Sequence, residues 1–278
     1  MDEVFGSWIN NIDELNKDYK NSRPFKHIVI DNFLNENYVE KVHDSFPNNF
    51  DTWYKYWNPI EVKYLDNRID KFDKVIQNVF EYLGKKEMVN IISKITDIED
   101  LEKDDFLHGA GLHAHPKNGR LMVHLDYEKH PYHESKQRRL NIILYLTKDW
   151  KKEWNGETEL WDEEVKKCEK KIDVVFNRAI LFQTNELSWH GLPEKIKCPD
   201  GIFRKSLAYY YISPLVNNPD KTKTGASEDG YRKKATFVYR PMDENKDKIQ
   251  RFLDIRPHRR IENKDILDIW PEWNEKDY

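Results

Sequence analysis

Cysteine is nearly absent from this sequence, which has two, Cys168 and Cys198, in 278 residues. So few thiols argue against a disulfide framework or a cysteine-based zinc site, and they favour a reducing location. Apolar runs are missing as well, because no stretch approaches the roughly 18 consecutive apolar residues of a membrane helix. The first residues, MDEVFGSWINN, have neither the basic nor the apolar region of a secretory signal. We therefore expect a cytoplasmic protein without a membrane partner.

An excess of one charge is also missing, since 46 basic residues face 50 acidic ones and the net charge is −4. Both signs are interspersed, which argues against a nucleic-acid binder with a basic face. The chain has no internal repeat and no linker rich in Pro, Gly or Ser. We expect a single domain over 1–278, with an N-terminal strand and helices in 1–104, a β core in 105–215 and a C-terminal extension in 216–278.

Short strands dominate the predicted core. PFKHIVID (24–31) predicts a strand that a helix follows, and residues 69–96 hold two further helical patterns. From about residue 105, six short segments alternate apolar and polar residues, and no helix of appreciable length separates them. This pattern predicts an antiparallel sandwich or barrel. These segments are LMVHLDY, RRLNIILYLT, ETELWD, VVFNRAILFQT, SWHGL and FRKSLAYYYIS.

Alternation assigns side chains to the two faces of these strands. In 140–147, Leu140, Ile142, Leu144 and Leu146 form an aliphatic face that we expect to pack against the N-terminal helices. The opposite face carries Asn141, Ile143, Tyr145 and Thr147, a mixed set suited to a ligand cavity. In 203–211, one face carries Arg204, Ser206 and Ala208, and the other carries Lys205 and larger residues.

The triplet His124-Leu125-Asp126 is the first candidate for chemistry. With 10 His in the chain, one His-x-Asp is expected by chance, so the triplet alone proves nothing. Its two polar side chains nevertheless project from one face of a strand, and His190 in SWHGLP is a third ligand from a later strand. Two His and one carboxylate on one face of a metal are the facial triad of non-haem Fe(II) oxygenases. The metal ligands and catalytic residues are therefore predicted to be His124, Asp126 and His190.

Arg204 comes on the strand that follows His190. A guanidinium inside a dry barrel is a strong bidentate partner for a carboxylate, and Tyr145 would help to fix the same anion. The neighbouring Lys205 is the alternative, and alternation with Ser206 favours Arg204. A second cluster, His113-Ala114-His115, has the His-x-His spacing of a cupin metal site without the glutamate that follows there.

Together these motifs resemble the Fe(II)/2-oxoglutarate-dependent oxygenases, specifically their prolyl-hydroxylase-like branch. The resemblance covers roughly 24–212 and includes RRLNIILYLTKDWKKEWNGETELWD, where Asn155-Gly156 replaces a Gly-Gly turn. It implies a double-stranded β-helix (jelly-roll, cupin-like), an α+β fold with a mostly β core and N-terminal helices. It also implies an oxidoreductase, a dioxygenase that uses Fe(II) as its metal and 2-oxoglutarate and dioxygen as cosubstrates. Ascorbate is a possible further cofactor. Arg204 and Tyr145 are then 2-oxoglutarate ligands, and Asn141 and His115 are expected beside them.

The substrate stays open at this stage. The branch resemblance favours a prolyl residue of a protein or peptide, and the alternative is a small-molecule metabolite. A peptide substrate needs a groove gated by mobile segments, and two stretches suit that role, 52–64 and 216–232. Within the first, TWYKYWNP could form a lid or cover a helix. The oligomeric state is unknown.

Overall fold

The core of the molecule is one large antiparallel sheet that curls into a barrel. The computed structural model describes residues 1, 3–216 and 221–274. Ten strands follow one another in the order β1-β10-β7-β12-β5-β3-β6-β11-β8-β9, and β2, β4 and β13 pair beside β3, β12 and β6. The bounds are β1 His27–Ile30, β2 Tyr54–Asn58, β3 Glu61–Asp66, β4 Glu102–Lys103, β5 Gly111–His115, β6 Arg120–Leu125, β7 Lys136–Tyr145, β8 Thr158–Trp161, β9 Cys168–Ile172, β10 Ala179–Gln183, β11 His190–Leu192, β12 Arg204–Pro214 and β13 Thr236–Phe237.

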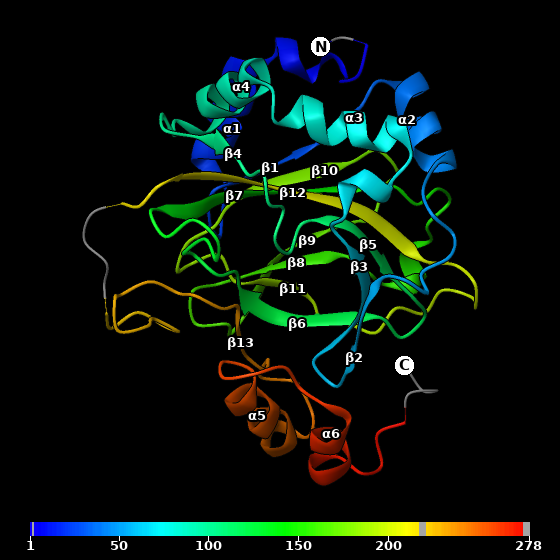
Figure 1. Ribbon diagram of the computed structural model, residues 1–278, viewed down its shortest axis with the longest axis vertical. Coiled ribbons are helices and arrows are strands. Elements are labelled where there is room, and N and C mark those ends of the chain that lie inside the picture. Colours follow the sequence, from blue (N-terminus) through cyan, green and yellow to red (C-terminus); the bar gives the residue numbers. More distant parts are fainter. Residues whose placement is uncertain (2, 217–220, 275–278) are drawn as a thin grey trace.

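Strand β3 joins the two halves of the barrel. Its C-terminal part pairs with β5 and its N-terminal part pairs with β6. The half that contains β7 and β12 therefore faces the half that contains β6, β11 and β8 (Figure 1). Side chains meet across the interior, where Tyr145 of β7 donates a hydrogen bond to Thr158 of β8. This is the jelly-roll architecture with flanking helices that the sequence predicts.

Four N-terminal helices cover the outer face of one half, at the top of Figure 1. They are α1 (Ile12–Asn21), α2 (Glu36–Asp44), α3 (Lys74–Leu83) and α4 (Lys86–Thr96). Asn35 and Asp73 cap α2 and α3 by accepting hydrogen bonds from backbone N–H groups of the first turn. The aliphatic face of β7 is fully buried in the same hydrophobic cluster as these helices, as alternation predicts: Leu140, Ile142, Leu144 and Leu146.

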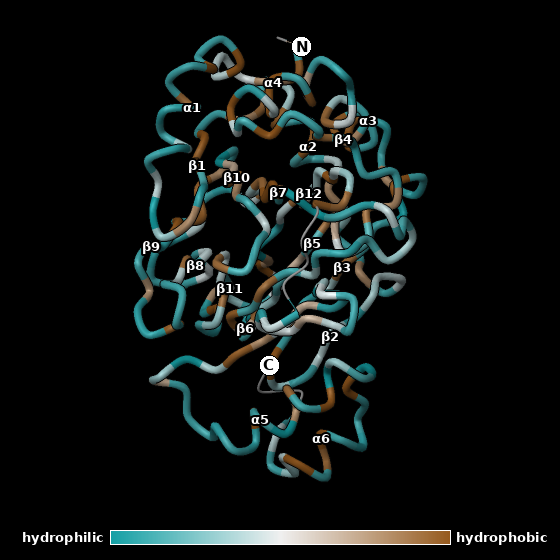
Figure 2. The backbone as a smooth tube through the Cα atoms, turned by 90° about the vertical axis from the view of Figure 1, so that its left-hand side faces the viewer, coloured by the Kyte–Doolittle hydropathy of each residue, from teal (hydrophilic) through white to brown (hydrophobic). Residues whose placement is uncertain are grey.

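A C-terminal lobe lies at the opposite end, where Figures 1 and 2 both place α5 (Lys246–Ile255) and α6 (Asn263–Ile269) beyond β6 and β2. Its apolar residues form a second core with two residues of the barrel, Ile60 and Met122. Phe252 of α5 is completely buried there. The extension therefore continues the core of the barrel, and its strand β13 pairs with β6.

Both segments expected to be mobile gates are built into the fold. Residues 54–66 form the β2–β3 hairpin, in which β3 lies inside the sheet and β2 pairs beside it. Trp53, just before this hairpin, is buried in the same cluster as the N-terminal helices. Of 216–232, the residues 217–220 lie outside the described part. The remainder is tied to the barrel by a Lys223–Glu128 ion pair of 2.7 Å and by Arg232, which is fully buried. Buried aromatic and charged side chains thus anchor parts of both segments to the barrel, which their polar composition did not indicate.

Strand β5 was not among the predicted strands, because GLHAH is short and offers only two apolar residues, Leu112 and Ala114, next to its histidines. It lies between β12 and β3 in the middle of the sheet. The predicted strand in 174–184 is shorter than expected, because Asn177 has a φ of 63° and β10 begins only at Ala179. Over the described part of the chain, no helix is long and apolar enough to cross a membrane.

Candidate metal and cosubstrate site

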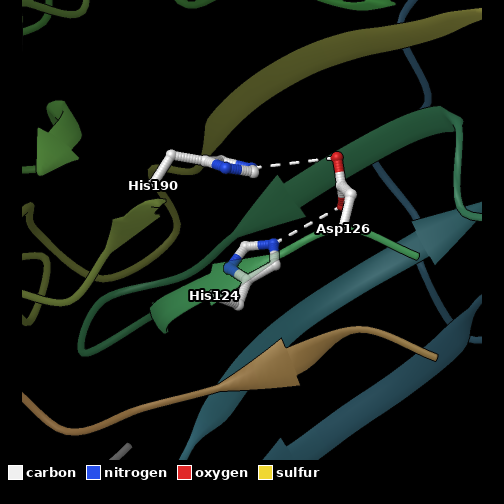
Figure 3. A group of neighbouring side chains, drawn as sticks. All are labelled: His124, Asp126 and His190. Carbon is white, nitrogen blue, oxygen red and sulfur yellow. Dashed lines mark ion pairs between the residues drawn. The ribbon is translucent and has the colours of Figure 1, made fainter. Parts of the chain in front are cut away.

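Three predicted metal ligands meet inside the barrel. His190 of β11 lies directly opposite His124 of β6 in the antiparallel register, and Asp126 follows the last residue of β6. The His124 Nε2 is 3.7 Å from one Asp126 oxygen, and the His190 Nε2 is 3.9 Å from the other (Figure 3). Their candidate ligand atoms all lie within 4.8 Å of one another, and among the described residues no other such group is found. The pairing of β6 with β11 thus brings the three candidate metal ligands together.

Hydrogen bonds orient both imidazoles toward the centre of this group. The His124 Nδ1 is 2.9 Å from the Met122 carbonyl oxygen, and the His190 Nδ1 is 2.8 Å from the Ser188 carbonyl oxygen. A carbonyl can only accept, so each Nδ1 carries the proton and each Nε2 is left with a free lone pair. Burial and the neighbouring His124 lower the pKa of His190 to about 4. The imidazole of His190 is therefore neutral and ready to bind a metal at neutral pH.

A buried arginine holds the Asp126 carboxylate. Arg138 Nη1 lies 3.3 Å from one Asp126 oxygen, and Asn141 Nδ2 donates to the other at 3.2 Å. The Arg138 guanidinium is sandwiched between the rings of Tyr127 and Tyr210, 3.6 and 3.2 Å from their centroids. Burial alone would raise the pKa of Asp126, but the Arg138 guanidinium holds it well below its usual range. The third ligand is therefore an ionised carboxylate in a fixed orientation.

Arg204 points into the same cavity from β12. Its Nε donates to the Gly156 carbonyl oxygen at 2.7 Å, and its Nη2 donates to Thr158 Oγ1 at 3.2 Å. The Tyr145 hydroxyl donates to the same Thr158 oxygen at 2.7 Å, and the guanidinium lies over the Tyr145 ring. Only 3% of Arg204 is exposed, yet its guanidinium bonds to neutral oxygens and forms no ion pair within the described chain. Because an unpaired buried charge is costly, we expect a ligand to supply the anion that pairs with this guanidinium.

The close approach of Gly156 to Arg204 depends on the absence of a side chain. Gly156 has a φ of 97°, and a Cβ there would lie 3.3 Å from Arg204 Cδ and 3.1 Å from the Trp150 ring. The Asn155-Gly156 turn therefore keeps the glycine at the position that bonds the arginine. The alternative anion ligand, Lys205, is on the other face of β12, where its Nζ donates to Asn48 Oδ1 at 2.8 Å.

Histidines of β5 line the cavity between Arg204 and the metal ligands. His115 is the register partner of Arg204, and its Nε2 is buried with no hydrogen-bond partner in the described structure. The Nε2 of His113 is in the same condition, as is the Oδ1 of Asn141. Burial, with Arg204 and Lys63 nearby, holds the pKa of both histidines well below the ordinary value. Neutral, unpaired polar atoms thus surround a cavity of about 220 Å³.

The predicted residues occupy distinct places around this cavity. His115, Asn141 and Arg204 line it directly, together with the three metal ligands. Tyr145 does not line it, and its hydroxyl acts on Thr158, which does. Sequence reasoning missed Arg138, Thr158 and Phe237, whose ring stacks on His124 with centroids 5.0 Å apart. Strict alternation from Tyr145 and Asn141 leads to Arg139 and not to Arg138. The register shift opposite Tyr211 and Ile212 breaks this alternation, so no local pattern indicates Arg138. Phe237 comes from a segment without any motif.

The donor set fits a divalent iron and a dicarboxylate. Two neutral imidazoles and one carboxylate from one side leave the remaining coordination positions open, as in non-haem Fe(II) oxygenases. The unpaired cation of Arg204, at the end of the cavity built by β8 and β12, suits the far carboxylate of 2-oxoglutarate.

Comparisons with known proteins agree with this arrangement. Residues 110–212 match the family model of the 2OG-Fe(II) oxygenase superfamily. No curated protein sequence matches the chain. Among solved structures, a prolyl hydroxylase from Trichoplax adhaerens, in complex with a hypoxia inducible factor peptide fragment, is 17% identical, with a TM-score of 0.52 over 77% of this chain and 96% of that one.

Two further structures have the same fold. A prolyl 4-hydroxylase from Phytophthora capsici is 18% identical, with a TM-score of 0.52 over 80% of this chain and 69% of that one. A prolyl-4-hydroxylase from Pseudomonas putida is 14% identical, with a TM-score of 0.50 over 74% of this chain and all of that one, 100%. At these identities the likeness concerns the fold.

Proposed function

We propose that this chain, whose residues 110–212 match the family model of the 2OG-Fe(II) oxygenase superfamily, hydroxylates an unactivated C–H bond of a prolyl residue in a protein or peptide. The observation that carries the oxygenase part is the buried group of His124, Asp126 and His190, which faces the unpaired guanidinium of Arg204 across one cavity.

Each residue around the cavity has a separate task. His124, Asp126 and His190 would hold Fe(II), and Arg204 with Thr158 would hold the far carboxylate of 2-oxoglutarate, with Tyr145 behind Thr158 and with His115 and Asn141 alongside. When bound, iron and 2-oxoglutarate supply the oxidation: one atom of dioxygen enters the substrate, the other enters succinate, and carbon dioxide leaves. The protein excludes water from this reaction, because every one of these residues is buried.

The prolyl assignment rests on the motif resemblance and on a fold shared with structures of prolyl hydroxylases. Fold alone does not define a substrate. One feature favours the alternative, a small-molecule substrate: the C-terminal segment that contains Lys233, Ala235 and Phe237 forms part of the wall of the cavity. Both candidates share the metal and cosubstrate site.

The test starts with binding and then moves to turnover. Anaerobic titrations should show one tight Fe(II) site and, in its presence, one 2-oxoglutarate site. Arg204→Ala should weaken 2-oxoglutarate binding by about 100-fold while iron still binds, because a buried charge-assisted pair is lost. Lys205→Ala, on the outer face of the same strand, is the matched control and should bind like the wild type.

Asp126→Ala should abolish tight iron binding, because two imidazoles alone hold a divalent ion poorly. Succinate formation, stimulated by proline-containing peptides or by small metabolites, then separates the two substrate classes. Unchanged iron binding and succinate production in Asp126→Ala would rule out the proposed metal site.

A further inference from the structure

The cavity has a second, charged end that the metal and cosubstrate do not require. It is lined by Glu61 and Lys63 of β3, by Lys233 and Lys234 of the C-terminal segment, and by Arg256 at the end of α5. We refer to these five residues as the outer end. Four of them are cationic and one is acidic. The outer end therefore carries a positive excess beside the place where the substrate must lie.

An ion pair at the outer end leaves one oxygen unused. Lys63 Nζ lies 3.0 Å from Glu61 Oε1, and both side chains are buried. The second oxygen, Glu61 Oε2, is buried and has no hydrogen-bond partner among the residues that the structure describes. Burial opposes the ionisation of Glu61, but Lys63 and Arg256 together hold its pKa below the ordinary value. A buried carboxylate oxygen without a partner is costly, so a donor from a ligand is expected to complete it.

Arg256 supplies a positive charge at the outer end, where Glu61 supplies a negative one. Its guanidinium stacks over Phe237, with Cζ 5.6 Å from the ring centroid, and it forms no ion pair in the described part of the chain. Lys234 is occupied by the backbone carbonyl oxygens of Pro257 and His258, and Lys233 pairs with Asp229 at 3.0 Å. Arg256 is thus the cation at the outer end that can bind a ligand anion without breaking an existing pair.

We infer that the outer end is a substrate subsite for a carboxylate with an N–H donor next to it, the carboxylate bound by Arg256 and the donor by Glu61. This chemistry occurs in a free amino acid and in an acidic segment of a peptide. The subsite accounts for the contribution of the C-terminal lobe to the cavity, because Arg256 comes from α5. The inference rests on the proposed function, since the subsite selects what is hydroxylated at the iron.

Matched probes test the subsite by binding alone. The protein is loaded with Mn(II) and 2-oxoglutarate without oxygen, and binding is followed by saturation-transfer NMR and calorimetry. L-proline is compared with L-prolinamide, and acetyl-Gly-Pro-Asp-amide with acetyl-Gly-Pro-Asn-amide; a mixture of the standard amino acids widens the small-molecule arm. At least one carboxylate should bind about tenfold more tightly than its amide. The pair that shows this difference identifies the source of the carboxylate as a free amino acid or a peptide.

Substitutions of Arg256 and Glu61 test whether these two residues bind the probes. Arg256→Gln should weaken the carboxylate probe about tenfold and remove the preference over the amide. Arg251→Gln, exposed on the same helix, is the matched control and should change neither. Glu61→Gln should weaken the probe with the N–H donor. All three variants should keep wild-type affinity for 2-oxoglutarate, measured in the same experiment.

The outcomes separate the two proposals. If no carboxylate binds to the loaded protein, if acid and amide bind equally, or if Arg256→Gln behaves like Arg251→Gln, the subsite is wrong while the oxygenase proposal stands. If 2-oxoglutarate itself does not bind to the wild type, the proposed function fails first.

Discussion

A buried cation beside a metal ligand controls how the Asp126 carboxylate is presented. Arg138 contacts one oxygen of Asp126 and is fixed in turn by two tyrosine rings. We predict that Arg138→Met weakens Fe(II) binding by about 10–100-fold, as the loss of an outer-shell partner does at other metal sites. Competition against a chelator measures the affinity. Arg139→Met is the control, because Arg139 points to the other face of β7, toward Ser213. Equal iron affinity in both variants would show that the carboxylate holds its orientation without Arg138.

Thr158 connects Arg204 to Tyr145 by hydrogen bonds. Its hydroxyl oxygen accepts from both Arg204 and Tyr145, so its own hydrogen is free for a ligand. We predict that Thr158→Val and Tyr145→Phe each weaken 2-oxoglutarate binding by about 3–10-fold, the equivalent of one hydrogen bond of roughly 1 kcal/mol. Because both act through one oxygen, the double variant should be less impaired than the product of the two effects. Independent, fully additive losses in a titration would mean that Tyr145 contacts the ligand itself.

At the level of single elements, strand β1 contains a buried histidine, His27, that makes the free energy of unfolding depend on pH. His27 is 1% exposed, its Nδ1 donates to the Phe25 carbonyl oxygen at 2.8 Å, and burial lowers its pKa to about 4. The unfolded chain, with an ordinary pKa near 6.5, binds the proton more readily than the folded one. The stabilisation is therefore complete above pH 6.5 and is lost as the pH falls toward 4.

The predicted size follows from the shift of the His27 pKa. We expect the free energy of unfolding to fall by up to about 3 kcal/mol from this group alone between neutral pH and pH 4. Urea unfolding at a series of pH values measures it. His27→Asn keeps a donor for the Phe25 carbonyl without titrating, so its curve should be flatter by that amount. Parallel curves for the two proteins would assign the acid sensitivity to other groups.

Alternation predicted the faces of β7 and β12 and the convergence of His124, Asp126 and His190, because in a strand the period of two relates sequence directly to side-chain direction. The resemblance extended this to Arg204. It did not identify β5, which is short and has only Leu112 and Ala114 as apolar residues, nor Phe237 and Arg256, which approach the cavity from a distant segment. Such contacts depend on tertiary packing that no local pattern contains. The gate expected in 216–232 stays a prediction, and the burial of Tyr231 and Arg232 within this polar stretch is likewise a tertiary contact that its composition does not indicate.

For the whole molecule, we propose that the three parts of 1–278 form one domain and predict that they unfold together. Phe252 of α5 is completely buried against the barrel-derived cluster, and Val238 next to β13 donates from its backbone N–H to Val123 of β6 at 2.9 Å. Phe252→Ala should cost about 3–5 kcal/mol, as loss of a fully buried phenylalanine does. The single thermal transition should shift down as a whole in near-ultraviolet circular dichroism and in calorimetry.

Leu267→Ala on α6 is the control for this last change, because that leucine is 64% exposed and its removal should leave the transition temperature nearly unchanged. A C-terminal lobe that folded separately would respond differently to Phe252→Ala. It would melt early in a transition of its own, while the barrel kept the wild-type transition temperature. That result would overturn the single-domain arrangement. A shift of one cooperative transition, accompanied by weaker iron binding on warming, would show instead that Phe237 and Arg256 reach the cavity as parts of the same folded unit as His124.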